Sequence, residues 1–382
     1  MKKLFSKLVN LIFERAGKGT GRLNKKDITS SDVAKKAGVS QASVSMILNR
    51  KYNVSFSRET IERVEKAAEE LGYSLSKKSK QRQSNMKKTI FVVCPHSSNS
   101  YYDMLIDGIE EVANMNKYSV FIAHTRRDET VEDRILRQIE KLRPSGLLFT
   151  CTPTSVEHMQ SLNEKIPLML IGEKDAVPGI DAVELNSRKL GGMIAKKLIE
   201  LGHRKVAYVT TPLSEKQTAR KRRLEGFCKE FENINGLDKV SIKTMPDEMN
   251  RILVGADSEY RTGYELTMEL IREVPDVTAI VGVNDMVALG IRDALLEEKY
   301  KIPEHITVIG CDNILFSKIR GIDLTTIDHY ASHKGREACK LLIRKIELSK
   351  NRKSEDEVVL QHRVEYEPRI IERGSSSYPV NK

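Results

Sequence analysis

Residues 28–49 read ITSSDVAKKAGVSQASVSMILN, and their pattern predicts the fold of the N-terminal part of the chain. Thr29 followed by Asp32 has the spacing of a capping box, which predicts a helix start. Gly38 is suited to end that helix, and Ser40 is a common N-cap for a second one. Apolar residues recur at helical spacing, namely Val33, Ala34 and Ala37, then Val39 in the turn, then Val44, Ile47 and Leu48. Two short helices joined by a glycine turn predict a helix-turn-helix motif.

A helix-turn-helix motif places the N-terminal end of its second helix in the major groove of DNA. An ordinary helical hairpin is the alternative, but the small residues, the glycine turn and the local basic excess favour DNA binding. Gln41 offers a paired donor and acceptor that match adenine. We therefore expect contacts to a double-stranded DNA operator from the motif's polar and exposed positions: Thr29, Ser40, Gln41, Ala42, Ser43, Ser45, Met46 and Asn49.

The positive charge is concentrated at the N-terminal end of the 382-residue chain, whose formal net charge is +11. Residues 1–88 carry 21 Lys and Arg against 8 Asp and Glu, whereas residues 89–382 carry 43 against 45. A small basic module on a nearly neutral body is typical of a polyanion binder. Charge alone does not distinguish DNA, RNA and anionic lipid.

Residues 1–26 form a basic extension with scattered apolar residues. Ser6, Lys7 and Asn10 interrupt the apolar positions and no A-x-A cleavage site follows, so a signal peptide is not predicted. The extension is either a short amphipathic helix that touches a membrane or DNA, or a disordered segment or misplaced start.

A third helix is predicted after Ser57 and before Gly72, which completes a DNA-binding domain over residues 27–73. Its apolar face consists of Ile61, Val64, Ala67, Ala68 and Leu71. Residues 74–88, SLSKKSKQRQSNMKK, are polar and basic without an apolar stripe, which predicts an inter-domain linker. Its cations are expected to contact DNA: Lys77, Lys78, Lys80 and Arg82.

The remainder of the chain has the pattern of an α/β protein. Apolar runs typical of strands alternate with helical patterns: TIFVVC, SVFIAHT, GLLFTCT, PLMLIG, KVAYVTT, AIVGVND and TVIGCDN. Repeated strand–helix units predict parallel sheets, and ligands of such folds bind at the carboxyl ends of the strands. Polar residues that follow strands are therefore candidates for a binding site: His96, Asn284, Asp285 and Asp312.

Several function classes lack their motifs. The sequence has no glycine-rich phosphate loop, G-x-S-x-G or H-E-x-x-H, so we expect no catalytic residues, cofactor or metal. No apolar run approaches the roughly 20 residues of a membrane span. The five cysteines are scattered and form no C-x-x-C pair, which is typical of thiols in a reducing, cytoplasmic compartment: Cys94, Cys151, Cys228, Cys311 and Cys339.

The chain resembles the lactose-repressor (LacI/GalR-type) family of bacterial transcription regulators over residues 27–376. The resemblance rests on DVAKKAGVSQASVSMILN and AAEELGY in the basic module, and on SYYDMLIDGIEEVA, LIELGHRKVAYV, RLEGF, NDMVALGIRDAL, VIGCDN, LTTID, GREACKLLIRKI and EPRIIERGSS in the body. It implies an effector-binding core like a periplasmic sugar-binding protein. Expected boundaries are a core over 89–376, an N-subdomain of about 89–185 and 328–355, a C-subdomain of about 186–327 and 356–376, and a tail over 377–382.

The resemblance also implies which residues bind an effector. Arg223, in RLEGF, occupies the place of an arginine that holds effector hydroxyls or carboxylates. The polar cleft positions correspond to Asn284, Asp312 and the adjacent Asp285, and the aromatic positions to Tyr101 and Tyr102. Alternatives remain, since Asp285 could cap a helix and Tyr102 could belong to the core. The cations at 220–222 are interpreted as a solvated charge run.

Three residues depart from the family pattern at the DNA end. Met46 stands where the family usually carries an arginine, so the family's usual operator cannot be transferred. Leu75 replaces a proline of the hinge, and Arg82 replaces a leucine that wedges into the minor groove. These changes predict either a minor-groove contact at A·T pairs with weak kinking or a disordered tether that attracts phosphates.

The expected function is a cytoplasmic, homodimeric, operator-binding regulator, a repressor controlled by a sugar-like effector, with no membrane partner. One alternative is a regulator of the same fold switched by a partner protein or corepressor. Another is a solute-binding or enzymatic α/β protein with an incidental basic extension.

Overall fold

The computed structural model describes residues 28–48, 56–71, 73, 88–95, 99–213, 218–232, 234, 240–246, 249, 255–351 and 361–380. The chain divides into two compact units, Met1–Ser84 and Asn85–Lys382. The division falls inside the predicted linker.

The N-terminal unit contains α2 (Ser30–Ala37), α3 (Gln41–Leu48) and α4 (Arg58–Glu70). The predicted capping box is present, because Thr29 Oγ1 accepts from the Asp32 backbone and the Asp32 carboxylate accepts from the Thr29 backbone at 2.7 Å. Gly38 ends α2 with a φ of 66°, and Ser40 Oγ accepts from the Ser43 backbone at 3.1 Å. The predicted apolar faces form one core: Val33, Ala34, Ala37, Val44, Ile47, Val64, Ala67 and Ala68. The helix-turn-helix prediction is confirmed.

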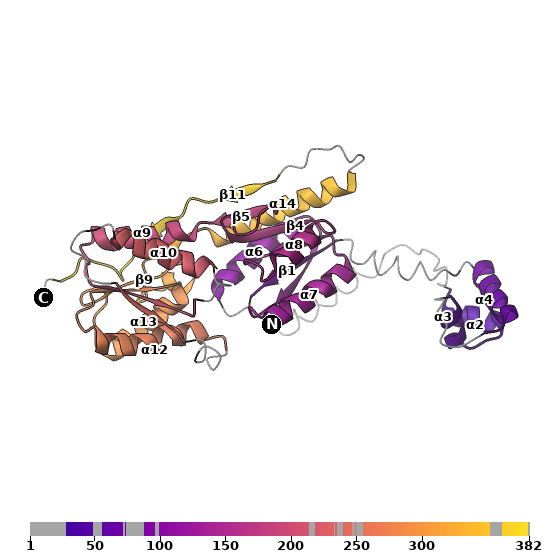
Figure 1. Cartoon of the computed structure of the whole chain (residues 1–382), viewed down its shortest axis with the longest axis horizontal. Helices are drawn as coiled ribbons and strands as arrows, with labels where there is room; N and C mark the ends of the chain where they lie inside the picture. The colour runs from indigo at the N-terminus through magenta and orange to yellow at the C-terminus, as the bar shows by residue number, and fades with distance from the viewer. Residues whose placement is uncertain are drawn as a thin grey trace, which may run out of the picture. The chain divides into compact units, whose positions relative to one another are not determined.

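The second unit begins with a parallel six-stranded sheet in the order β11-β5-β4-β3-β1-β2 (Figure 1). Its strands are β1 (Thr89–Cys94), β2 (Ser119–His124), β3 (Gly146–Phe149), β4 (Leu168–Glu173), β5 (Ala182–Leu185) and β11 (Arg363–Glu365). Helices α6 (Ser100–Met115) and α14 (Ala331–Asn351) cover one face, and α7 (Glu129–Leu142) and α8 (Val156–Asn163) cover the other.

The helices on both faces of the sheet explain the uninterrupted apolar runs of this N-subdomain. Val92 of β1 packs with α6 and α14, whereas its neighbour Val93 packs with α7 and α8. Ile171 and Leu170 of β4 divide in the same way. Since successive strand residues point to opposite faces, both sets must be apolar when helices cover both faces.

The C-subdomain has a parallel four-stranded sheet in the order β7-β6-β8-β9. Its strands are β6 (Val206–Thr210), β7 (Ser241–Thr244), β8 (Ala279–Gly282) and β9 (Thr307–Ile309). Its helices are α9 (Ser187–Glu200), α10 (Thr218–Glu232), α12 (Ser258–Glu273), α13 (Asp285–Glu297) and the 3-10 turn η1 (Phe316–Lys318). Strands β10 (Thr326–Asp328) and β12 (Arg369–Ile371) pair antiparallel in a separate ribbon.

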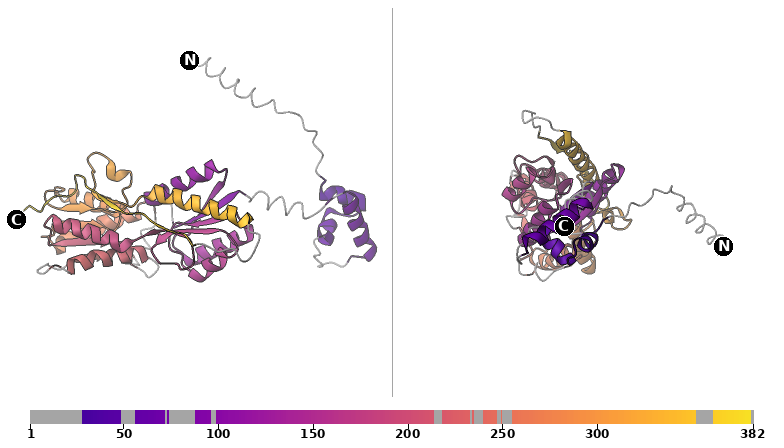
Figure 2. Two further views of the ribbon diagram at one scale, coloured as in Figure 1. Left: turned by 90° about the horizontal axis from the view of Figure 1, so that it is seen from above. Right: turned by 90° about the vertical axis from the view of Figure 1, so that its right-hand side faces the viewer.

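The C-terminal segment passes from the N-subdomain to the C-subdomain, because β11 pairs with β5 and the following β12 pairs with β10 (Figure 2). This corrects the expectation that 356–376 belongs to the C-subdomain. Strand β11 adds to β5 of the N-subdomain, with Val364 opposite Val183, and Arg363 forms an ion pair with Glu184. The expected tail also begins inside the fold, because the Ser377 backbone bonds with Thr307 Oγ1 at 3.1 Å.

None of the helices in the described ranges combines the length and apolar character that crossing a membrane requires.

Candidate functional site

A cavity of about 730 Å³, its open mouth included, lies where residues of both subdomains meet. Several strands point their carboxyl ends at it: Asn99 follows β1, Thr150 follows β3, Asn284 follows β8 and Asp312 follows β9. The remaining lining includes Tyr101, Tyr102, Arg127, Cys151, Thr152, Ile171, Gly172, Glu173, Leu185, Thr218, Ala219, Arg220, Arg223 and His329.

Arg223 projects from α10 into this cavity and is 6% exposed. Its Nη1 donates to the Val283 carbonyl, and its Nε is buried without a partner. Burial acts to lower the pKa of Arg223, but Cys311 and Asp312 outweigh it, so the pKa is raised and the side chain is cationic. A buried cation with an unused donor is suited to hold an oxygen-rich ligand.

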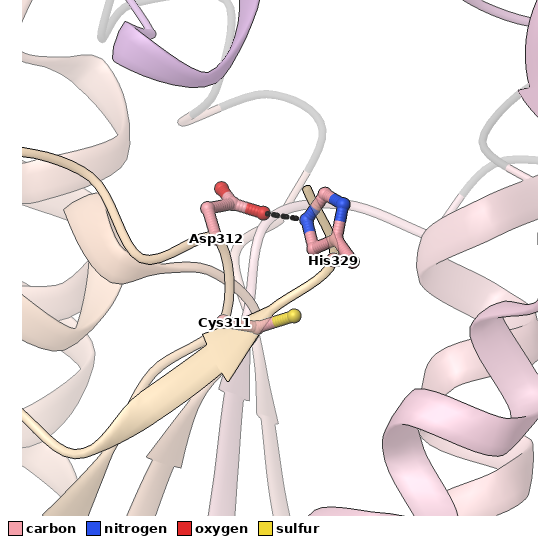
Figure 3. A group of neighbouring side chains, drawn as sticks. All are labelled: Cys311, Asp312 and His329. Atoms are coloured by element: carbon pink, nitrogen blue, oxygen red, sulfur yellow. Dashed lines mark hydrogen bonds and ion pairs between the residues drawn. The ribbon is translucent and has the colours of Figure 1, made fainter. Parts of the chain in front are cut away.

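Asp312 and His329 form a buried pair on the same wall (Figure 3). His329 Nε2 lies 3.0 Å from Asp312 Oδ1, and Lys334 Nζ lies 3.3 Å from His329 Nδ1. Burial raises the pKa of Asp312 to about 7. Burial also lowers the pKa of His329 and lowers that of Lys334 to about 7. His329 is therefore neutral, and its two nitrogens are held between a carboxyl group and an amine.

Glu259 of α12 joins the two subdomains at the cavity. Its Oε2 accepts from Asn99 Nδ2 of the N-subdomain at 2.7 Å and from Asn284 Nδ2 of the C-subdomain at 2.8 Å. Its Oε1 pairs with Arg220 of α10. Because this carboxylate is 10% exposed and contacts both sides, opening of the cleft must break its bond to Asn99.

A second connection lies beside the first. Arg222 Nη1 of the C-subdomain donates to the Lys174 carbonyl at 2.5 Å and lies 3.4 Å from Glu173 Oε1, both in the N-subdomain. The other oxygen of Glu173, Oε2, is buried without a partner. It is an unused acceptor in the cavity wall.

Two tyrosines at the start of α6 supply the aromatic surface. The rings of Tyr101 and Tyr102 lie 5.1 Å apart edge to face, and the rings of Tyr101 and His329 lie 5.2 Å apart. The Tyr102 hydroxyl accepts from Arg127 Nη2 at 2.8 Å. Burial raises the pKa of Tyr102 to about 12, so it remains a neutral phenol.

Family models match both units of this structure. Residues 29–76 match the lacI family of bacterial regulatory proteins, and residues 87–367 match the periplasmic binding proteins and sugar binding domain of the LacI family. The chain belongs to the LacI family. It is thus a DNA-binding transcriptional repressor whose core has the fold of sugar-binding domains.

Individual relatives agree with the family. The HTH-type transcriptional repressor PurR of Haemophilus influenzae (strain PittEE) is 32% identical, over 91% of this chain and 98% of the relative. The ribose operon repressor of Escherichia coli (strain K12) is 29% identical over 91% and 99%. A solved LacI-family regulator from Enterococcus faecalis V583 with bound ribose is 25% identical, with a TM-score of 0.63 and coverage of 76% and 99%.

The structure brings five predicted effector residues of this LacI-family core together around one cavity: Tyr101, Tyr102, Arg223, Asn284 and Asp312. His96 lies outside the described residues. Asn284 also caps α13, since its Oδ1 accepts from the Val287 backbone at 3.0 Å.

The expectation that Asp285 binds the effector is corrected, because the structure does not place this residue in the cavity wall. It is fully buried behind the wall, where its carboxylate accepts from the Ile314 backbone at 3.0 Å, from Ser317 Oγ at 2.6 Å and from Thr326 Oγ1. The strand-end rule selected the right turn but could not tell which of its two residues, Asn284 or Asp285, lines the cavity.

The interpretation of 220–222 as a solvated charge run is wrong. The Arg220 side chain is 14% exposed and lines the cavity, and Arg222 is 27% exposed and bridges the subdomains. Sequence reasoning also missed Asn99 and His329, although both follow strands. It had no signal for Arg127, which lines the cavity, or for Glu259, which bonds two of the lining residues; tertiary packing alone brings both there.

At the DNA end, the predicted contact residues lie on and beside α3. Ala42 and Ser45 are exposed, whereas Ser43 and Met46 are half-buried. Gln41 is exposed, and its Nε2 donates to Ser30 Oγ at 2.9 Å, which leaves the second N–H of that amide and its Oε1 for other partners. Five predicted contact residues lie outside the described part of the chain: Asn49, Lys77, Lys78, Lys80 and Arg82.

Cys311, Asp312 and His329 offer three potential metal ligand atoms within 4.8 Å of one another (Figure 3). Thiolate, imidazole and carboxylate would suit zinc. However, His329 Nε2 is already bonded to Asp312, and the adjacent Arg223 and Lys334 both interact electrostatically with Cys311. The positive surroundings disfavour a further cation, and we assign no metal here.

Proposed function

We propose that this protein is a cytoplasmic, homodimeric repressor whose cleft binds a sugar or sugar derivative and thereby controls operator binding. The cavity carries this proposal, because it combines amide, carboxyl and guanidinium groups for hydroxyls with tyrosine rings for an apolar sugar face. Relatives whose names or titles mention ribose support the same effector class. Its role is regulatory rather than catalytic.

The two cross-cleft connections suggest how the effector acts. Glu259 bonds Asn99 across the cleft, and Arg222 bonds Glu173 and Lys174. A ligand in the cavity must rearrange or reinforce these contacts and so shift the equilibrium between subdomain arrangements. Coupling between an effector site and a DNA site is typically about 1–3 kcal/mol.

Arg223→Ala is expected to abolish the response to the effector while operator binding without effector persists. The variant removes a buried donor that faces the ligand, which raises the effector Kd by at least about tenfold. Gel shifts with the operator fragment, with and without candidate sugars, measure both properties. Lys229→Ala, on the exposed face of the same helix, is the control.

The same gel shifts separate the alternatives. Release of DNA by a sugar, lost in Arg223→Ala, supports the proposal. A folded Arg223→Ala variant with an unchanged response would remove Arg223 from the site. A protein that ignores all small molecules but responds to cell extract would support a partner protein or corepressor as the switch.

Gln41→Ala is expected to relax sequence preference at one position of each operator half-site. A paired contact from glutamine to adenine provides about 1–3 kcal/mol of discrimination. Ser30→Ala is the matched control, because it removes only the bond that holds Gln41 in the absence of DNA. Affinities for operators changed one base pair at a time test this, and a uniform loss across sequences would show that Gln41 contacts only the backbone.

A further inference from the structure

The charged groups at the cleft do not balance. Arg220 is neutralised by Glu259 and Arg222 by Glu173. Arg127 and Arg223 line the same cavity, yet neither forms an ion pair with a carboxylate of the described residues, and the Nε atom of each is buried without a partner. Among the described residues, the cleft therefore has more guanidinium groups than carboxylates that pair with them.

Among the described residues that line the cavity, one further carboxyl group remains, that of Asp312, and the amine of Lys334 lies behind it; these two groups do not remove the excess. Asp312 interacts with Arg223 but is also bonded to His329, behind which Lys334 adds an amine. If Lys334 is neutral, Asp312 balances Arg223 and leaves Arg127. If Lys334 is charged, the surplus is larger.

Arg127 is the clearest of these cations. It lies between β2 and α7, and among the described residues its guanidinium is held by one hydrogen bond, from Nη2 to the Tyr102 hydroxyl at 2.8 Å. That phenol is neutral and cannot compensate the charge. The planar fork of arginine matches two oxygens of a carboxylate or a phosphate.

Glu173 has the opposite requirement, because it needs a hydrogen-bond donor where Arg127 needs an acceptor. Its buried Oε2 lacks a donor, and a hydroxyl group would supply one. A simple anion would satisfy Arg127 but not Glu173, and a neutral sugar would satisfy Glu173 but leave the charge of Arg127 uncompensated. A hydroxyl-bearing anion satisfies both.

We propose that the effector is an anionic sugar derivative, a sugar phosphate or a sugar acid, and that Arg127 binds its anionic group. This inference rests on the proposed function, in which the cleft is the effector site. It adds a specificity-determining residue, because Arg127 selects the charged compound over its neutral parent.

The test compares neutral and anionic members of matched pairs on the full-length protein. Thermal unfolding and calorimetric titration use ribose with ribose 5-phosphate, glucose with glucose 6-phosphate, and glucose with glucuronate. Inorganic phosphate against chloride at equal ionic strength probes the anion alone. We expect at least one anionic compound to bind at least tenfold more tightly than its parent, and phosphate to raise the melting temperature. The phosphate and carboxylate arms identify the preferred anion.

Three variants assign the preference to Arg127. Arg127→Gln is expected to reduce the ratio of anionic to neutral affinity by at least tenfold, and Arg127→Lys, which keeps the charge, to retain part of it. Arg126→Gln changes the exposed neighbour in the same loop and is expected to retain the full ratio. Each variant is compared with its own ligand-free form, so a loss of stability does not obscure the result. Equal affinity for all pairs, or an unchanged ratio in Arg127→Gln, would overturn the inference.

Operator release measured in parallel separates the two proposals. If the protein prefers anionic ligands through Arg127 but no ligand changes its binding to DNA, the anion subsite stands and the proposed effector role is rejected. Operator release by a neutral sugar, as potent as its anionic counterpart, would keep the effector role and reject the anion subsite.

Discussion

Replacing Gly191 by alanine is expected to destabilise the C-subdomain strongly, whereas the same change at Gly192 is expected to be neutral or stabilising. A Cβ at Gly191 would lie 1.8 Å from the Arg223 carbonyl oxygen and 2.8 Å from the Phe227 backbone nitrogen. These are backbone atoms of α10, so the two helices would have to separate. Overpacking costs roughly 1–3 kcal/mol and occasionally more, and we expect the upper end of that range.

Gly192 is the matched control because it lies one residue further along α9. A Cβ there would meet the Glu230 side chain at 3.3 Å, which can move. Alanine is also favoured over glycine within a helix by about 1 kcal/mol. Urea unfolding of both variants measures the difference, and equal stabilities would show that α9 and α10 are not packed this closely.

The Gly191 change has a functional consequence as well. The atom that the new Cβ would meet belongs to Arg223 itself, so displacement of α10 moves the guanidinium that faces the cavity. Effector affinity should fall in Gly191→Ala even under conditions in which the protein remains folded. A Cβ at Gly226 would likewise lie 2.0 Å from the Arg188 carbonyl oxygen, which explains the glycine in RLEGF.

Local features of the sequence were sufficient to predict the DNA-binding unit and the α/β core. The caps at Thr29, Ser40 and Ser57 are interactions between residues three apart, so the local sequence contains all the information. The buried strands were equally evident because both of their faces are apolar. Strand β11 was not evident from the sequence, because its Arg-Val-Glu pattern has no strand signature. Its pairing with β5 joins residues about 180 positions apart.

The residues of the cavity also divide into those that the local sequence predicts and those that only tertiary packing brings there. Asn284 and Asp312 follow strands, and topology alone places them at the cleft. The bond between Asn99 and Glu259 spans 160 residues of sequence, and only the packing of α12 against the rest of the C-subdomain brings Glu259 there. Arg220 could not be separated from Lys221 and Arg222 by composition, because a run of cations looks the same whether it faces water or a ligand.

Asp285→Ala is expected to lower the free energy of unfolding by about 2–4 kcal/mol, because two hydroxyls and one backbone N–H lose a buried acceptor. Burial, followed by the nearby Asp312, raises the pKa of Asp285 to about 6. The folded state therefore binds this proton more tightly than the unfolded state, and the stability that Asp285 contributes falls as the pH rises through about 6.

Chemical unfolding at pH 5 and pH 8 should consequently show the larger cost at pH 5. Glu298→Ala, at the exposed end of α13, should change stability by less than about 0.5 kcal/mol at either pH. An Asp285→Ala protein that is as stable as the wild type but no longer binds effector would return Asp285 to the binding site and contradict its structural role.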